Sequence, residues 1–557
     1  MTMRSPRGKS AQHAPSTLGL ESHDIGVGVP HDSHHCTSSS VHGSDTRDHH
    51  SIGGGALAFA DLKAQLRRDH TITDWDPEDR EAWDNGNAAV AKRNLIWSVI
   101  CEHVGFSIWS LFSVMALFMG PEYGISMDQK FIIAATATLV GSCLRIPYTQ
   151  ATARFGGRNW AIFSAVVLLI PTGLTMMLMM NPGEFGFGWF LAVAAITGFG
   201  GGNFASSMTN INAFYPQRLK GWALGLNAGG GNIGVPVVQV IGLLVIWLFA
   251  DKPEIVCAIY LVALAVAGVG AAIYMDNLDH QTASGRAMID CLKHRDTWLI
   301  CLLYVGTFGS FIGFGFAFSQ VLNISFTSAG AAKPALAAAQ IAWIGPLLGS
   351  VVRPYGGKLA DRIGGGKVTL YCFIAMAASA SILVVAGMSA DANGKVISGG
   401  VLAAFIVGFI LLFLLSGIAN GSVYKIIPTI WEHKAQSLSG LNSHGRTKWS
   451  RSMSGALIGI AGAAGGLGGV GINLVLRASY KSNQSATQAF WVFLSFYVMA
   501  AVVTWWFYAR RPIVIGETTD LPVAGTPEGV PAAGDEVRPS GVASEGTDKQ
   551  ATKEALA

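Results

Sequence analysis

The feature that most constrains this chain is a succession of long apolar segments. A helix needs about 20 mostly apolar residues to cross the hydrocarbon core of a bilayer. About twelve such runs lie between Asn94 and Tyr508. The first six are near 94–119, 129–150, 160–180, 188–214, 221–250 and 254–275, and the second six are near 297–322, 335–357, 367–389, 399–427, 453–476 and 487–509. We therefore predict an all-α membrane protein with twelve transmembrane helices.

Composition supports this fold class and weakens several others. Hydrophobic residues make up 51% of the chain and charged residues 13%, with a mean hydropathy of +0.41, which is hard to reconcile with a water-soluble surface. A net charge of +4 is too small to argue for nucleic-acid binding. The seven cysteines include no CxxC pair, so neither a disulfide framework nor a metal site is predicted. An enzyme is the least favoured class, because no nucleophile, metal cluster or cofactor motif is found.

The spans and the polar stretches between them divide the chain into five predicted parts. These are a mostly disordered cytoplasmic tail at 1–93, a six-helix half at 94–275, a cytoplasmic linker at 276–296, a second six-helix half at 297–510 and a disordered tail at 511–557. Eight of the 14 histidines lie in residues 1–69 of the first tail, but no fixed ligand spacing recurs, so a solvated low-complexity tail is favoured over a metal site. Basic residues gather in alternate loops, and the positive-inside rule then puts both termini in the cytoplasm, with the protein in the cell membrane.

The two halves share an internal repeat between the second span and the eighth. Arg145, Arg154, Gly156 and Gly157 recur with identical spacing as Arg353, Arg362, Gly364 and Gly365. The repeat predicts two related halves with a substrate site near the midplane between them. The loops "RFGGR" and "DRIGGGK" resemble the short cytoplasmic loop motif of the major facilitator superfamily, and this resemblance implies that Asp361 and Arg362 brace the inward gate.

The leading arginines of the repeat, Arg145 and Arg353, are candidates for binding substrate. An arginine within a span costs roughly 2.5 to 3.5 kcal/mol on insertion scales, so something must compensate it. Taken alone, Arg145 could instead snorkel to the cytoplasmic interface. Its counterpart at the same depth in the other half favours two guanidinium groups that converge on one cavity. A planar, forked cation pair matches a small planar oxyanion such as nitrate or nitrite.

The fourth and fifth spans are rich in glycine and buried amides. Glycines at helical spacing permit close helix packing, and those selected for packing or gating are Gly225, Gly229, Gly231 and Gly234, with Gly462 and Gly466 in the eleventh span. A phosphate-binding loop is rejected, because no Gly-Lys-Ser/Thr follows. The amides Asn203, Asn210, Asn227 and Asn232 need polar partners within the membrane, which a cavity can supply.

Several segments together resemble the nitrate/nitrite porter family, the NarK-like members of the major facilitator superfamily. They include "ITDWDPED" before the first span, the stretch from Gly198 to Gln239, "YVGTFGSFIGF" in the seventh span and "GIAGAAGGLGGVGIN" in the eleventh. The resemblance implies that Arg145 and Arg353 clasp the anion and that Asn232 contacts it. It also implies that the rings of Phe106, Phe204 and Phe308 sandwich the anion and that the Tyr304 hydroxyl donates to it.

Three residues depart from this pattern and bear on coupling. Glu102 and His103 lie in the first span and Lys425 in the tenth, where apolar residues are expected. They could be hydrated structural groups, or they could carry or gate a proton. We therefore hypothesise proton-linked nitrate import, with nitrate/nitrite exchange as the alternative and a nitrate-binding membrane sensor as an alternative of another class. We expect nitrate, nitrite, protons and lipid as partners of a functional monomer, and no cofactor; the sequence leaves open whether it serves nitrate assimilation or nitrate respiration.

Overall fold

The computed structural model describes residues 70–249, 252–279 and 285–510. Twelve helices in this part of the chain are long and apolar enough to cross a membrane, so the predicted number of spans is confirmed. The disorder predicted for 1–69 and 511–557, and the histidine-rich tract, lie outside the described residues. Residues 70–93, which we assigned to the tail, are folded, and the helix of the first span begins within them.

The first half contains six spans, three of which are assembled from more than one helical element. The first span combines α2 (Arg80–Ala82), the π-helical turn η1 (Trp83–Asn87), α3 (Ala88–Trp109) and α4 (Leu111–Phe118). A short turn, η2 (Pro121–Tyr123), leads to the remaining helices: α5 (Met127–Phe155), α6 (Gly157–Met180), α7 (Phe187–Thr197), α8 (Phe199–Phe214), α9 (Gln217–Asn232), α10 (Gly234–Leu248) and α11 (Glu254–Tyr274). Spans four and five consist of α7 with α8 and of α9 with α10.

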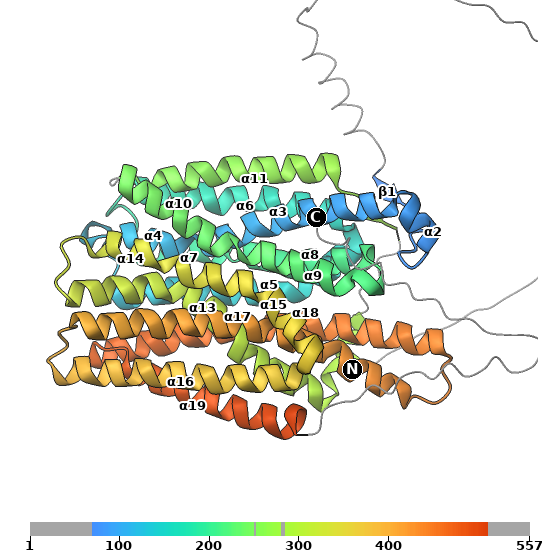
Figure 1. The fold of residues 1–557 in the computed structure, drawn as a ribbon. Helices are drawn as coiled ribbons and strands as arrows, with labels where there is room; N and C mark the ends of the chain where they lie inside the picture. Colours follow the sequence, from blue (N-terminus) through green and yellow to red (C-terminus); the bar gives the residue numbers. More distant parts are fainter. Residues whose placement is uncertain (1–69, 250–251, 280–284, 511–557) are drawn as a thin grey trace, which may run out of the picture. The chain divides into compact units, whose positions relative to one another are not determined.

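The second half follows a linker that holds β2 (Asn277–Leu278) and the short helix α12 (Gly285–Leu292). Its helices are α13 (Arg295–Ser328), α14 (Pro334–Ala342), α15 (Ile344–Ile363), α16 (Gly365–Ala392), α17 (Gly399–Gln436), α18 (Ser443–Asn483) and α19 (Thr487–Thr504), which ends in the π-helical turn η3 (Trp505–Ala509). The first-half helices, blue to green, occupy the upper part of Figure 1, and α16, α17 and α19 the lower part. The halves meet mainly where α5 packs against α18 and α9 against α15.

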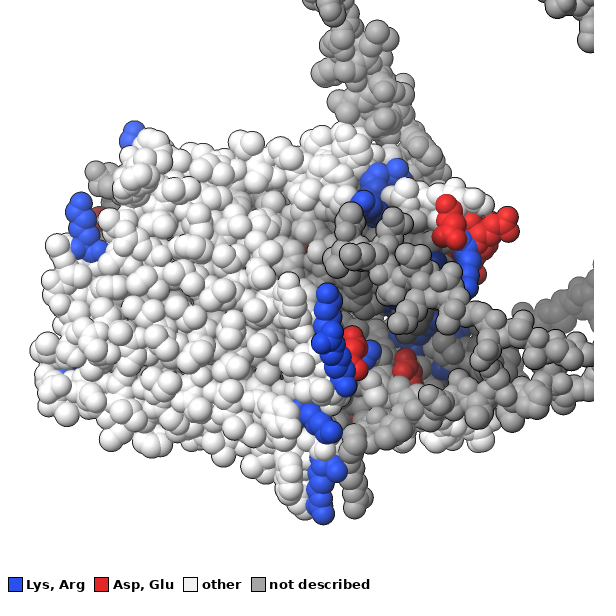
Figure 2. Space-filling view, in the orientation of Figure 1, with Lys and Arg blue, Asp and Glu red and all other residues white. Residues whose placement is uncertain are grey.

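The surface of this helical bundle is sorted by charge along the helix axes. Figure 2 shows a broad belt of uncharged side chains between two ends that carry the lysine, arginine, aspartate and glutamate residues. Large apolar side chains such as Trp247, Val262 and Val385 are 64–70% exposed within the spans. Such an apolar belt is suited to lipid and not to water.

The internal repeat has the same backbone form in both halves. Gly156 separates α5 from α6 with φ 86°, and Gly364 separates α15 from α16 with φ 92°. A side chain at either position would force a strained left-handed backbone, so the repeat needs glycine there. Asp361, in the second copy, forms an ion pair with Lys425 of α17 at 2.6 Å, which ties the end of α15 to its neighbour.

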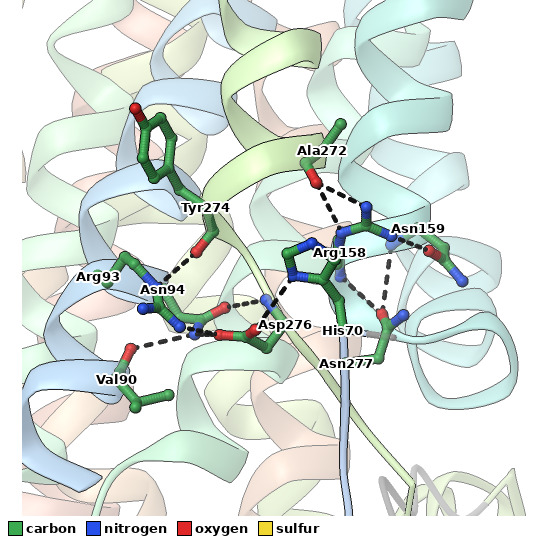
Figure 3. A network of polar contacts seen from close by, with 10 residues as sticks. All are labelled: His70, Val90, Arg93, Asn94, Arg158, Asn159, Ala272, Tyr274, Asp276 and Asn277. Atoms are coloured by element: carbon green, nitrogen blue, oxygen red, sulfur yellow. Dashed lines mark hydrogen bonds and ion pairs between the residues drawn. The ribbon is translucent and has the colours of Figure 1, made fainter. Parts of the chain in front are cut away.

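Residues 70–79, which we call the N-terminal strap, fold back onto the end of the first half. The strap contains β1 (Thr71–Ile72), which pairs in parallel with β2. Asp276 anchors it: one carboxylate oxygen lies 3.3 Å from His70 Nδ1, and the other accepts bonds from Arg93 at 2.6 Å and Asn94 at 3.0 Å. Figure 3 shows these side chains converging on Asp276 from the strap and from α3.

We expect replacement of Asp276 by asparagine to loosen the strap. The change replaces the charged acceptor of Arg93 and of the buried Asn94 with a neutral amide, and the loss of a charged partner costs about 1–3 kcal/mol. Hydrogen exchange at residues 70–79 in the purified protein should accelerate, and the thermal unfolding midpoint should fall. Asp290→Asn, which removes an exposed pair with Lys293, is the matched control and should change neither reading. Equal effects of the two substitutions would contradict an anchoring role.

Candidate anion-binding site

Arg145 and Arg353 lie in the interior between the two halves. Arg145 projects from α5 and is 0% exposed, and Arg353 projects from α15 and is 4% exposed. Arg145 therefore does not snorkel to an interface in this conformation. The two guanidinium groups are close enough to repel each other electrostatically. Two neighbouring buried cations need a source of negative charge.

Each arginine is only partly satisfied by the protein. Arg145 Nη1 donates to the carbonyl oxygen of Gly462 at 2.9 Å, and Arg353 Nη2 donates to the Tyr304 hydroxyl at 3.0 Å. Among the described residues, Nε and Nη2 of Arg145 and Nη1 of Arg353 have no hydrogen-bond partner. Both amide atoms of the buried Asn232 are also without one. The guanidinium N–H groups and the amide Nδ2 of Asn232 are donors from which an oxyanion can accept.

Aromatic rings surround the guanidinium groups. The Cζ atom of Arg145 lies 4.6 Å from the ring centroids of both Phe204 and Phe308. The Phe308 ring stacks on Tyr304 with centroids 5.3 Å apart, and Phe106 lies 6.2 Å from Phe204. The structure thus brings together six of the seven residues expected to bind the anion, namely the two arginines, the three phenylalanines and Tyr304. In this conformation, however, the rings of Phe204 and Phe308 pack against the arginines.

Two further aromatic residues complete the site and were missed from the sequence. Tyr424 of α17 lies 5.1 Å from Arg353 Cζ and packs edge-on against Tyr304, and Trp109 of α3 lies 5.4 Å from Arg145 Cζ. Aromatic residues are so common in spans that nothing in the sequence distinguishes these two. Tyr424 does adjoin Lys425, so a search of the polar stretch around Lys425 in the sequence could have found it.

The three candidates for proton coupling have different surroundings. Glu102 is fully buried, and its Oε2 atom accepts bonds from Ser207 at 2.5 Å and Asn227 at 2.8 Å. Its carboxylate attracts both Arg145 and Arg353.

The other two candidates are held elsewhere. The His103 ring lies 3.3 Å from the Gly230 carbonyl oxygen. Lys425 is half-exposed in its ion pair with Asp361, as expected of a hydrated structural group. The structure therefore leaves Glu102 as the titratable carboxyl group that faces the arginines.

A cavity of about 1220 Å³ connects the surroundings of Arg145 with one end of the bundle. Arg145 and Phe204 line its inner part, and exposed residues such as Asp74 of the strap and Lys448 of α18 line its mouth. At the opposite end the halves touch, because Ser319 donates to the Ser113 carbonyl at 2.9 Å and Gln239 to the Gly315 carbonyl at 3.0 Å. The site is therefore accessible from the end that carries the strap.

Comparisons with known proteins show which family the chain belongs to. The family model described as Major Facilitator Superfamily matches residues 100–447. The nitrate/nitrite transporter NarU of Salmonella typhimurium is 34% identical over 79% of this chain and 97% of its own length. The chain belongs to the nitrate/nitrite porter family of the major facilitator superfamily. A more distant relative, the probable nitrate/nitrite antiporter NarK2 of Thermus thermophilus, is 28% identical over 79% of this chain and 97% of its own length.

Membership of the nitrate/nitrite porter family confirms three predictions: the family itself, the fold class, and a multi-pass membrane transporter in place of an enzyme. The crystal structure of a D-xylose-proton symporter supports the fold alone. It superposes with a TM-score of 0.50 at 15% sequence identity and covers 75% of this chain and 96% of that chain.

The glycines selected for packing behave differently from one another. A Cβ atom added at Gly231 would lie 2.1 Å from Glu102 Oε1. A Cβ atom at Gly234 would lie 2.1 Å from the His103 carbonyl oxygen, and a Cβ atom at Gly466 would lie 2.1 Å from Ser142 Oγ. At Gly462 it would lie 3.3 Å from Arg145 Nη1. The prediction is wrong for Gly225, where nothing lies within 4 Å, and at Gly229 the nearest atom is 3.8 Å away. Gly466 and Gly462 let α18 approach α5 beside the arginines.

We expect Gly466→Ala to disturb the contact between the halves. The new methyl group would also lie 2.8 Å from Ser142 Cβ, so α18 must move away from α5. Nitrate uptake by the purified protein in liposomes should fall at least tenfold. Gly471→Ala, on the same helix but with open space around it, should leave uptake unchanged. Similar activity of the two variants would show that the close approach is unimportant for transport.

Proposed function

We propose that this chain moves nitrate and nitrite across the cell membrane by alternating access, with both termini in the cytoplasm. One observation carries the proposal: two buried arginines with unused donors lie between the halves, and a cavity reaches Arg145 from one end. The relatives named as nitrate/nitrite transporters support the same substrates. In this conformation the anion would enter or leave through the predicted cytoplasmic end.

The shape and charge of the site suit a small planar anion. A guanidinium group presents two parallel N–H donors in one plane, which match two oxygens of nitrate or nitrite. The flat faces of Phe204 and Phe308 are near enough to cover such an anion once the arginines turn towards it. The unpaired amide of Asn232 and the Tyr304 hydroxyl supply further polar contacts.

Charge balance points to proton coupling through Glu102. With Glu102 ionised, the two arginines and this carboxylate leave one net positive charge, which a monovalent anion neutralises. Protonation of Glu102 leaves two positive charges and so strengthens anion binding, and by linkage the bound anion favours the proton to the same extent. The empty site and the site loaded with both ions carry the same charge. Because proton binding and anion binding strengthen each other, the site suits import of nitrate together with a proton.

Replacement of Arg353 by lysine tests the bidentate site. Lysine keeps the charge but not the planar fork, so the apparent affinity for nitrate should fall roughly 10- to 100-fold, or about 1.4–2.7 kcal/mol. The measurement is the concentration dependence of nitrate uptake into proteoliposomes. Arg286→Lys, an exposed change on α12, is the matched control and should have no effect. Full affinity in the Arg353→Lys protein would sink the bidentate model.

Replacement of Glu102 by glutamine tests the coupling. Glutamine resembles the protonated acid and can still accept from Ser207 and Asn227, so exchange of labelled nitrate across the membrane should persist. An imposed pH gradient should no longer drive net uptake, whereas Glu122→Gln, an exposed change, should retain this response. If the unaltered protein takes up nitrate only when nitrite is loaded inside, exchange is the coupling mode. If it binds nitrate without moving it, a sensor is the answer.

A further inference from the structure

A second, small cavity lies beside Glu102 and is distinct from the large anion cavity. It has a volume of about 20 Å³ and lies between α3, α6 and α8. The two cavities share no lining residue. Helix α8 separates them, because Phe204 and Met208 face the anion cavity while Asn203, Ser206 and Asn210 face the small one. Glu102 lines only the small cavity.

The small cavity can hold one ordered water molecule. A water needs about 10–15 Å³ of such space and two to four polar partners. Among the described residues, Glu102 Oε1 and Asn203 Oδ1 are buried without a hydrogen-bond partner. Ser98 and Asn210, whose side chains lie 3.4 Å apart, also line the cavity. A bridging water would satisfy the two unpaired oxygens.

Polar residues continue from this cavity to the end of the first half. On α3, Asn94, Ser98 and Glu102 follow one another at intervals of four residues and so lie on one face of the helix. All three are buried. Asn94 donates to Asp276 at 3.0 Å, and Met275 beside Asp276 lines the small cavity. The Asp276 carboxylate in turn contacts His70 and the half-exposed Arg93 (Figure 3).

We propose that the proton bound by Glu102 exchanges with the cytoplasm through this polar file inside the first half, and not through the anion cavity. The file runs from Glu102 through the water site at Ser98 and Asn210 to Asn94, Asp276 and His70. The inference rests on the proposed coupling through Glu102. A separate route keeps the proton away from Arg145, which stands at the inner part of the anion cavity and repels cations.

Charged groups face both ends of the file. Arg145 of α5 and Arg353 of α15 face Glu102, while the contacts from α8 and α9 are the neutral Ser207 and Asn227. The next residue of α3, His103, lies against the Gly230 carbonyl oxygen instead. Asp276 faces His70 of the strap, Arg93 of α3 and Arg158 of α6. A proton that leaves Glu102 therefore moves from two cations towards a carboxylate and an imidazole.

Replacement of Ser98 by valine tests the file. The branched apolar side chain fills the water site and removes its hydroxyl, so uptake of nitrate driven by a pH gradient should fall at least tenfold. A dye inside the liposomes should report the same loss of proton entry. Exchange of labelled nitrate at equal pH should be unchanged, because no proton need leave Glu102 during exchange. Ser379→Val, at a buried serine of α16 in the other half, is the matched control.

The outcomes separate this inference from the proposed coupling. If a pH gradient does not drive uptake by the unaltered protein, coupling through Glu102 fails. If it does, and Ser98→Val responds as strongly, the polar file is overturned while the coupling stands. If Ser98→Val loses exchange as well, the substitution has disturbed the fold, and Ser206→Val, which narrows the same cavity from α8, is measured in its place. Loss of uptake driven by a pH gradient, with exchange retained, then supports the polar file, and unchanged uptake overturns it.

Discussion

The burial of two arginines between the halves is the constraint on which the rest of this structure depends. A buried guanidinium without compensation is costly, and here it is compensated by parts drawn from both halves. Arg145 of the first half bonds a carbonyl oxygen of α18, and Arg353 of the second half attracts Glu102 of α3. The relative position of the halves is therefore coupled to the charge at the site. An anion or a proton that changes this charge acts on both halves at once.

Glycine makes that arrangement sterically possible. Main-chain atoms of α18 approach α5 beside Arg145, and those of α9 and α10 approach α3 beside Glu102 and His103. Side chains at Gly466, Gly231 or Gly234 would separate these helices and open the site. The same absence of side chains exposes carbonyl oxygens such as that of Gly462 as hydrogen-bond acceptors. The glycine-rich segments thus serve the polar chemistry of the site as well as helix packing.

Helix α8 of the first half has the anion cavity, which is also lined by α18 of the second half, on one side and the polar file on the other. This division follows from the helical period, because Phe204 and Met208 are four residues apart and Asn203 and Asn210 lie on the opposite side of the same helix. The file passes through Asp276 to His70, and Asp276 also anchors the N-terminal strap. The strap carries Glu78, which pairs with Arg451 of α18 at 3.2 Å across the mouth of the anion cavity. The anion cavity and the polar file therefore both end near the strap.

Much of the fold and part of the site could be predicted from the sequence. Twelve apolar runs determine twelve spans because backbone polar groups cannot face lipid unless they bond within a helix. The repeat of Arg145 and Gly156 as Arg353 and Gly364 revealed related halves, since the left-handed turn at each glycine restricts that position. The ring of aromatic residues came from family resemblance, and residue periodicity alone did not indicate it.

Only the tertiary structure decided which polar residues meet. Lys425 lies 26 residues after the start of α17, or about 39 Å along it, beyond the roughly 30 Å of a bilayer core. It therefore reaches Asp361 near the end of the bundle, which the sequence did not reveal. Glu102 meets Ser207, Asn227 and the arginines through packing of four other helices, and Tyr424 meets Arg353 in the same way. The sequence determined which segments enter the membrane because that choice depends on local hydropathy; contacts between distant segments depend on how the helices pack.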